Sequence, residues 1–400
     1  MTEQPPYPSR PGSGIRVWYR PMRSRDSSEH HRVATPLELL FDLCFVVAVG
    51  QAAAQLHHAL AEGHIGHGVF SFALVFFGIW WGWLNFSWFA SAFDTDDVPY
   101  RLVTLVQIAG GLTVAAGVER AFDGDFRVMV AGYVLMRLAM VVQWLRASRS
   151  DPGCRPSALR YAAGIAGCQV LWVGYLWLPH GLQPVAFFVF AVLELAVPIW
   201  AESRRGTTWH PHHIAERYGL FTLIVLGEVI LGATNAIKEG TAEPGHIGAL
   251  ISLAAAALVL VFSMWWLYFD RPGHARLVRN RGLLTTMSWG YGHYFIFASA
   301  AAVGAGLEVA VAYDTHTLHD VGGIAAALAT TVPVAVFLLS VWLLHIGPTN
   351  ECRPIAVGFP VTAVLVVAAS FTPAPIHVAA VLAAALVAVT VVFAHGQPQG

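Results

Sequence analysis

The sequence predicts an all-α protein: a polytopic membrane bundle of about twelve transmembrane helices, arranged as two parallel six-helix repeats. Hydrophobic residues make up 56% of the 400 positions, and charged residues only 12%, about half of the roughly 25% usual in soluble domains. Apolar runs long enough to cross a bilayer recur along the chain. This composition excludes a nucleic-acid-binding protein, a disordered protein and an ordinary cytosolic enzyme. The net charge of −1 implies no strongly charged partner.

Twelve apolar runs separated by turn residues are expected to form the helices, because a helix satisfies its own backbone groups in lipid. None of the runs alternates as a strand of a membrane β-barrel would. The runs cover residues 34–56, 68–93, 100–119, 127–146, 158–179, 184–201, 213–236, 246–269, 283–309, 321–346, 355–372 and 375–394. The two six-helix halves are therefore expected at residues 34–205 and 213–395.

The first 33 residues predict a disordered basic tail. They hold six arginines among proline and serine residues, and no apolar segment follows the N-terminus directly, as a signal peptide would require. With this tail in the cytoplasm, 18 of the 23 lysines and arginines fall on cytoplasmic segments. The positive-inside rule then predicts that both termini are cytoplasmic.

Three pairs of acidic residues recur in the same order in the two halves, with 176 to 189 positions between partners. The pairs are Glu38 and Glu216, Asp94 and Asp270, and Glu119 and Glu308. Because each half holds an even number of helices, both halves run in the same direction. The pattern predicts a parallel internal repeat, as in several transporter folds.

Glu38 and Asp42 are the first candidates for an ion or substrate pathway. Their i, i+4 spacing puts both carboxylates on one face of the first helix, with Asp42 about 12 Å from the start of the run. Glu38 has a structural alternative, because an acid near a helix N-terminus is stabilised by the helix dipole.

Four further ionisable residues complete the predicted pathway, because charge inside a bilayer needs a partner, water or a function. Glu216 lies at the entry of the seventh helix and Glu228 near its middle. Arg137 lies about 13 Å inside the fourth span and is expected to pair with Asp42 or Glu228; anion binding is the alternative. Glu194 in the sixth span has no obvious partner in the sequence.

Two groups of residues have ordinary explanations. His57, His58, His64 and His67 fall within eleven residues and are weak metal candidates, but their spacing matches no known class of metal site. The tryptophans of the second and eighth spans are expected in an interfacial aromatic belt. The four cysteines show no ligand spacing, and no cofactor is predicted.

Two motifs carry a family resemblance. The first span holds Thr35-Pro36-Leu37-Glu38-Leu39 and Phe41-Asp42-Leu43, and the seventh holds Glu216-Arg217, Gly219-Leu220-Phe221 and Leu226-Gly227-Glu228. Together they resemble the signatures of the bacterial low temperature requirement protein A family, over roughly residues 33–395. The chain departs from that pattern at Leu40, where an aromatic is common, and at Gly50, where a threonine is expected before Gln51.

The resemblance implies a multi-pass protein of the bacterial inner membrane, linked by name to growth in the cold. The buried carboxylates add the expectation of a secondary transporter or an ion or proton pathway, not an enzyme. Its expected partners are the lipid bilayer and a small solute or ion, with no nucleic acid. The alternatives are a membrane scaffold or stress-adaptation protein whose buried charges are structural, and an intramembrane enzyme acting on lipid.

Overall fold

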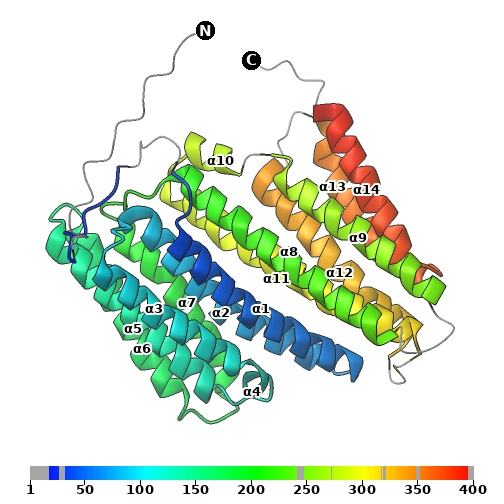
Figure 1. Ribbon diagram of the computed structural model, residues 1–400, viewed down its shortest axis with the longest axis horizontal. Coiled ribbons are helices and arrows are strands. Elements are labelled where there is room, and N and C mark those ends of the chain that lie inside the picture. The colour runs from blue at the N-terminus through cyan, green and yellow to red at the C-terminus, as the bar shows by residue number, and fades with distance from the viewer. Residues whose placement is uncertain are drawn as a thin grey trace, which may run out of the picture.

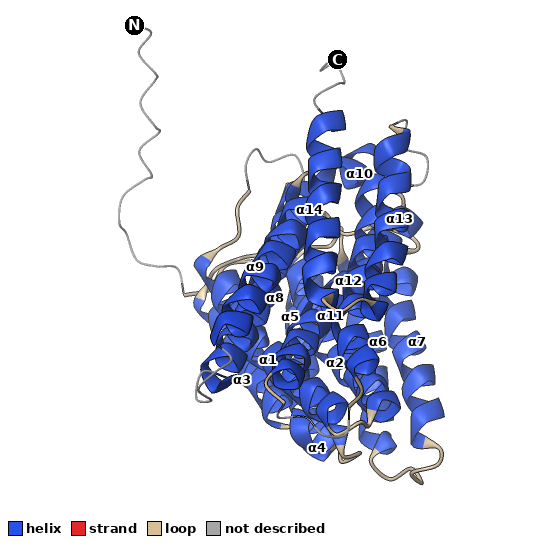
Figure 2. Cartoon of the chain, turned by 90° about the vertical axis from the view of Figure 1, so that its right-hand side faces the viewer, coloured by secondary structure: helices blue, strands red, loops and turns tan. Residues whose placement is uncertain are grey.

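The computed structural model describes residues 18–26, 32–240, 247–271, 273–316, 318, 321–347 and 352–394. Every regular element in these ranges is helical, and none is a strand (Figures 1 and 2). The long helices of the first part are α1 (Pro36–Ala61), α2 (Ile65–Phe93), α3 (Val98–Ala116), α5 (Arg127–Ser150), α6 (Arg155–Tyr175) and α7 (Gln183–Glu202). Those of the second part are α8 (Pro211–Gly240), α9 (Ile247–Phe269), α11 (Leu283–Asp314), α12 (Gly323–Val341), α13 (Arg353–Ala368) and α14 (Pro375–Ala394).

Short helical pieces complete the fold. They are α4 (Val118–Phe122), α10 (His274–Arg279), a π turn η1 (Trp342–Ile346) after α12, and a 3-10 turn η2 (Ala369–Phe371) after α13.

Each predicted apolar run overlaps one long helix, and the prediction of a multi-pass helical membrane protein is confirmed. Within the described residues, ten helices are long and apolar enough to cross a membrane. Helices α6 and α8 are not among these ten, so two fewer helices qualify than the twelve predicted. In α6 the charged side chain of Arg160 lowers the mean hydropathy.

Neighbouring helices pack in the same order in the two parts of the chain. In the first, α1 packs on α2 and α3, and then α3 on α5, α5 on α6 and α6 on α7. In the second, α8 packs on α9 and α11, and then α11 on α12, α12 on α13 and α13 on α14. The second part also has an extensive contact between α14 and α9, which the corresponding helices α7 and α2 of the first part do not match. The two parts meet where α1 and α2 contact α8 and α11, which lie side by side in the middle of Figure 1.

Aromatic side chains fill the contact between the two parts. Trp83 of α2 is fully buried, and its ring stacks on Phe221 of α8 with centroids 4.3 Å apart and meets Phe297 of α11 edge-on. Trp80 and Trp81 are also buried. The predicted interfacial belt is therefore wrong for these three tryptophans, because the helix that carries them lies inside the bundle. Between membrane helices such close packing supplies much of the attraction.

The segment Trp18–Asp26, together with Arg32, lies against the bundle. The Arg25 N–H donates to the Ala92 carbonyl at 2.9 Å, and the Arg32 guanidinium donates to the Ala90 and Ser91 carbonyls at the C-terminal end of α2. The last carbonyls of a helix lack partners within it, so these donors satisfy them. The predicted tail covers residues 1–33; residues 1–17 and 27–31 lie outside the described residues. Residues 18–26 are held in place, which differs from the disorder expected there.

Asp97, at the N-cap of α3, ties this segment to the bundle. Its carboxylate accepts from the N–H of Tyr100 at 3.0 Å, from the N–H of Arg20 at 2.8 Å and from the guanidinium of Arg146. Burial alone would raise the pKa of Asp97, but the hydrogen bonds from Arg146, Arg20 and Tyr100 outweigh it and hold this pKa below the ordinary value.

We expect this contact to make stability depend on pH. Because the pKa of Asp97 is lower in the folded protein, its stabilising effect is complete above the ordinary carboxyl pKa of about 4 and is lost as the pH falls through the folded pKa. Asp97→Asn keeps a good cap but loses the charge, at a cost of roughly 1.5–3 kcal/mol. Its melting temperature in detergent at pH 7 should be a few degrees lower, with a flatter dependence below pH 5. Asp96→Asn, at the exposed neighbouring position, is the control; equal effects of the two substitutions would contradict this role.

Candidate functional site

Two acid–base pairs join α1 to α8. The Asp42 carboxylate lies 2.6 Å from the Arg217 guanidinium, and the Glu38 carboxylate lies 3.2 Å from the His213 Nε2. All four side chains are at most 1% exposed. The two helices begin at the same end of the bundle and run side by side (Figure 1), so residues four apart on one helix face residues four apart on the other. We call these two pairs the α1–α8 ladder.

Each acid of the ladder is also held within the first part of the chain. Asp42 accepts from the Trp83 indole N–H at 2.7 Å, and Arg217 donates to the Ser87 hydroxyl at 3.0 Å. Glu38 completes a capping box with Thr35 at the start of α1. The sequence offered only the helix dipole as a structural role for Glu38, so the capping box is a second structural role. The ladder therefore fixes the register of α1 on α8 while both acids stay hydrogen-bonded.

Glu194 forms a second buried centre within the first part of the chain. Its carboxylate accepts five hydrogen bonds: from Arg137 at 2.8 Å, Trp81 at 2.9 Å, Tyr133 at 2.9 Å, Gln169 at 3.2 Å and Trp172 at 3.3 Å. We call this the Glu194 centre. The expected pairing of Arg137 with Asp42 or Glu228 is wrong, because Glu194 on α7 faces Arg137 across the bundle and Asp42 is taken by Arg217.

Sequence reasoning missed the neutral donors of these two centres. Trp81 and Trp83 were expected at the membrane interface, and no role was predicted for Trp172, yet the indole N–H groups of all three donate to buried carboxylates. A buried tryptophan usually finds an acceptor for its N–H. The sequence did contain one signal for this. Asp42 and Glu194 lie within apolar runs and need buried donors, and the tryptophans of α2 can supply them.

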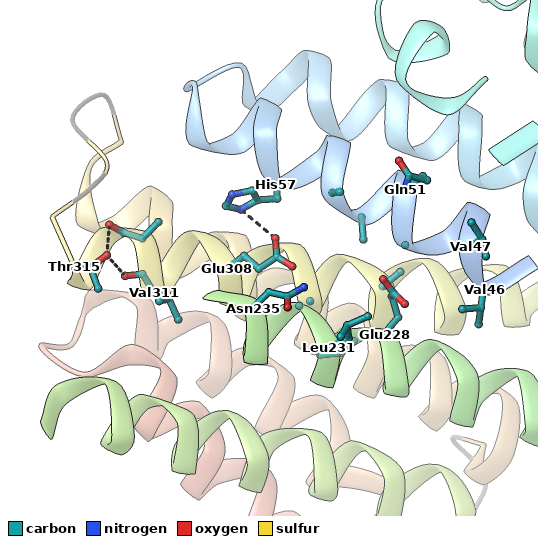
Figure 3. Close-up of a pocket in the computed structure, with 18 residues that line it drawn as sticks. Val46, Val47, Gln51, His57, Glu228, Leu231, Asn235, Glu308, Val311 and Thr315 are labelled. Carbon is teal, nitrogen blue, oxygen red and sulfur yellow. Dashed lines mark hydrogen bonds and ion pairs between the residues drawn. The ribbon is translucent and has the colours of Figure 1, made fainter. Parts of the chain in front are cut away.

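A pocket of about 640 Å³ lies between α1, α8 and α11, beyond the ladder toward the other end of these helices (Figure 3). Its polar lining comes from Gln51, His57, Glu228, Asn235, Glu308 and Thr315, and valine, leucine, alanine and glycine residues form the rest of its wall. The volume is in the range of small-molecule sites.

The two pocket carboxylates differ in their partners. Glu308 lies 3.7 Å from the His57 Nδ1. Glu228 is half-buried near the middle of α8 and makes no hydrogen bond or ion pair with the described residues. A carboxylate at membrane depth without a charged protein partner costs about 2.5–3.5 kcal/mol, so Glu228 is the acid that packing does not explain.

Two glycines make room for these carboxylates. A methyl group built on Gly50 of α1 would overlap the Glu228 carboxylate, and one on Gly232 of α8 would overlap that of Glu308. Gly50 is the position where the sequence departs from the expected threonine. Its lack of a side chain lets Glu228 lie against α1.

The remaining candidates lie apart from the pocket. Glu216 is half-buried near the start of α8, Glu119 is exposed on α4, and Asp270 is half-buried just after α9. Asp94, after the end of α2, lies 3.7 Å from Arg25, and burial raises the pKa of its carboxyl to about 6. Of the clustered histidines only His57 reaches the pocket; His58, His64 and His67 are exposed. Among the described residues no group of three His, Cys, Asp or Glu side chains could hold a metal ion.

Comparison with known proteins gives one family and one relative. The family model for the bacterial low temperature requirement A protein matches residues 33–394. An uncharacterised protein of Rhizobium meliloti (strain 1021), RA0937, is 28% identical over 261 residues. The match covers 61% of this chain and 60% of that protein. No solved structure is significantly similar to the fold.

We expect the Glu194 centre to be essential for stability. Glu194→Gln leaves Arg137 buried without a counter-charge, which should cost about 3–5 kcal/mol. Trp81→Phe removes one donor of five and should cost roughly 1–2 kcal/mol. Thermal melts in detergent would measure both, and the double variant Arg137→Met with Glu194→Gln should recover part of the loss. A Glu194→Gln variant as stable as the parent would contradict this role.

The ladder should show direct energetic coupling. Asp42→Asn and Arg217→Gln each strand one buried charge, so each alone should lower stability by several kcal/mol. Together they strand none, so the double variant should be more stable than the sum predicts, by 1 kcal/mol or more. A double-mutant cycle on the purified protein measures this difference. Strictly additive effects would show that the two side chains do not act as a pair.

Proposed function

The chain belongs to the bacterial low temperature requirement A family, and we propose that it acts as a secondary transporter of a cation. The proposed site is the pocket between α1, α8 and α11, with Glu228 as the residue that binds the cation. The protein would lie in the bacterial inner membrane, and the proposal includes no catalytic step.

The observation that carries the proposal is Glu228. It faces a pocket of about 640 Å³ and has no charged partner among the described residues. An anionic group placed in this way favours a cation, because a bound cation offsets the cost of keeping the charge within the membrane. Ionisable residues that face a cavity inside a membrane protein mark ion and substrate pathways more often than packing sites.

A transporter suits this geometry better than an open channel. Between the pocket and the ladder, α8 presents Phe221 and Val225, both fully buried. The ladder itself is buried beyond them. The pocket is thus closed toward the end of the bundle where α1 and α8 begin, so passage requires a conformational change, as in alternating access.

The proposal includes a topology of twelve spans in two parallel halves. Counting α6 and α8 as spans is supported by their length and by the matching order of helix packing in the two parts. Arginines gather at the end where α1 begins, for example Arg101, Arg146, Arg160 and Arg205, which supports a cytoplasmic location for that end. The pocket would then open to the outer side.

A structural role is the second candidate for the other buried charges. The Glu194 centre is saturated with donors, and such a network stabilises and orders a bundle without binding anything. In this division of roles the Glu194 centre and the ladder hold the fold, and the pocket binds the cation.

Reconstituted vesicles test the proposal. The purified full-length protein is placed in liposomes, and uptake of Na⁺, K⁺, H⁺ and small organic ammonium ions is followed against empty liposomes. We expect uptake of at least one of these cations, and Glu228→Gln should reduce it tenfold or more.

Two controls make the result decisive. Asp123→Asn, an exposed acid distant in sequence from the pocket helices, should transport like the parent protein. Detergent melts should show that Glu228→Gln is folded. Uptake no greater than in empty liposomes, or uptake unchanged in Glu228→Gln, would overturn the proposal.

A further inference from the structure

The pocket is too large for a bare metal ion. Its volume of about 640 Å³ compares with about 30 Å³ for one water molecule in the liquid. A desolvated metal ion needs several ligands close together, and no suitable group of three acidic, histidine or cysteine side chains occurs in the described part of the chain. The volume and the mixed lining instead suit a small organic cation.

The two carboxylates lie at different levels along the bundle. Glu228 lies against Gly50, whereas Glu308 lies against Gly232 and next to His57. Four residues of α8 separate Glu228 from Gly232, and seven residues of α1 separate Gly50 from His57. These intervals correspond to roughly 6 Å and 10 Å of helix rise. The pocket therefore presents two anionic groups about one to two helical turns apart.

The wall between these two levels is apolar. Ala53 and Ala54 of α1 and Leu231 of α8 line the pocket there, as Figure 3 shows for Leu231 between Glu228 and Asn235. A short hydrocarbon chain would replace water against such a wall favourably. Gln51 and Asn235, both exposed at the edge of the pocket, supply amide oxygens that can accept from an ammonium N–H.

From these features we propose that the pocket takes an aliphatic diamine, which deepens the proposed cation transport and rests on it. One ammonium group pairs with Glu228 and the other with Glu308, and the methylenes between them lie along the alanine and leucine wall. A monoamine can pair with only one of the two carboxylates.

Calorimetric titration of the full-length protein in nanodiscs tests this proposal with putrescine as probe and n-butylamine as its matched single-charge control. The parent protein should bind putrescine at least tenfold more tightly than butylamine. In Glu228→Gln and in Glu308→Gln, the affinity for putrescine should fall to about that for butylamine. Glu228→Asp, which keeps the charge with a shorter reach, should bind putrescine with intermediate affinity and guards against a folding defect in the amide variants.

Three outcomes would overturn the diamine proposal. They are equal affinity for the two amines, undiminished putrescine binding in both amide variants, and loss of putrescine binding when phosphatidylethanolamine replaces phosphatidylglycerol in the nanodiscs. The last would assign the site to a lipid headgroup amine. If the diamine experiment fails but the liposomes show Glu228-dependent uptake of another cation, the diamine proposal is wrong and the proposal of cation transport is retained. If no cation shows Glu228-dependent uptake, both proposals are wrong.

Discussion

The contact between α1 and α8 is the constraint on which the rest of the structure depends. Asp42 with Arg217 and Glu38 with His213 place four buried ionisable side chains in one ladder. None of them is stable alone in a low-dielectric interior, so the two helices must meet in this register. That register also determines which residues face each other further along, and it brings Gly50 opposite Glu228.

The buried acids divide into two kinds once their partners are known. Glu194 accepts five hydrogen bonds, and Asp42 is held by a guanidinium and an indole. Glu228 has neither, although it lies further from the start of its helix than Asp42 does. The position of an acid within an apolar run therefore predicts that it is buried. Its hydrogen-bond partners then show whether it stabilises the packing of the bundle, as Glu194 and Asp42 do, or faces a pocket, as Glu228 does.

Periodicity and hydropathy predicted the helices well because each helix is a local property of its own residues. Every predicted apolar run, from residues 34–56 to 375–394, overlaps a long helix. The side-chain partners could not be predicted in the same way. Arg137 has Glu194 as its partner 57 positions away, and Asp42 has Arg217 175 positions away. Such pairs follow from the lateral order and rotation of the helices, which no single helix specifies. The tryptophan N–H donors were harder still to predict, because tryptophan is also common at the membrane interface and the sequence does not distinguish the two locations.

The pocket and the ladder lie on the same pair of helices, which links binding to the contact between the two parts of the chain. Widening the pocket separates Gly50 of α1 from Glu228 of α8, and a rigid helix transmits that displacement to Asp42 and Arg217, about 12 Å away along α1. Separating Asp42 from Arg217 leaves two buried charges without their partner, which costs several kcal/mol. A cation bound in the pocket to Glu228 and Glu308 would instead favour the closed pocket, and with it the closed ladder. An alternating-access cycle on this scaffold therefore needs a second partner for Arg217 when the ladder opens, and Ser87, already 3.0 Å from Arg217, is the nearest group that could keep part of that hydrogen bonding.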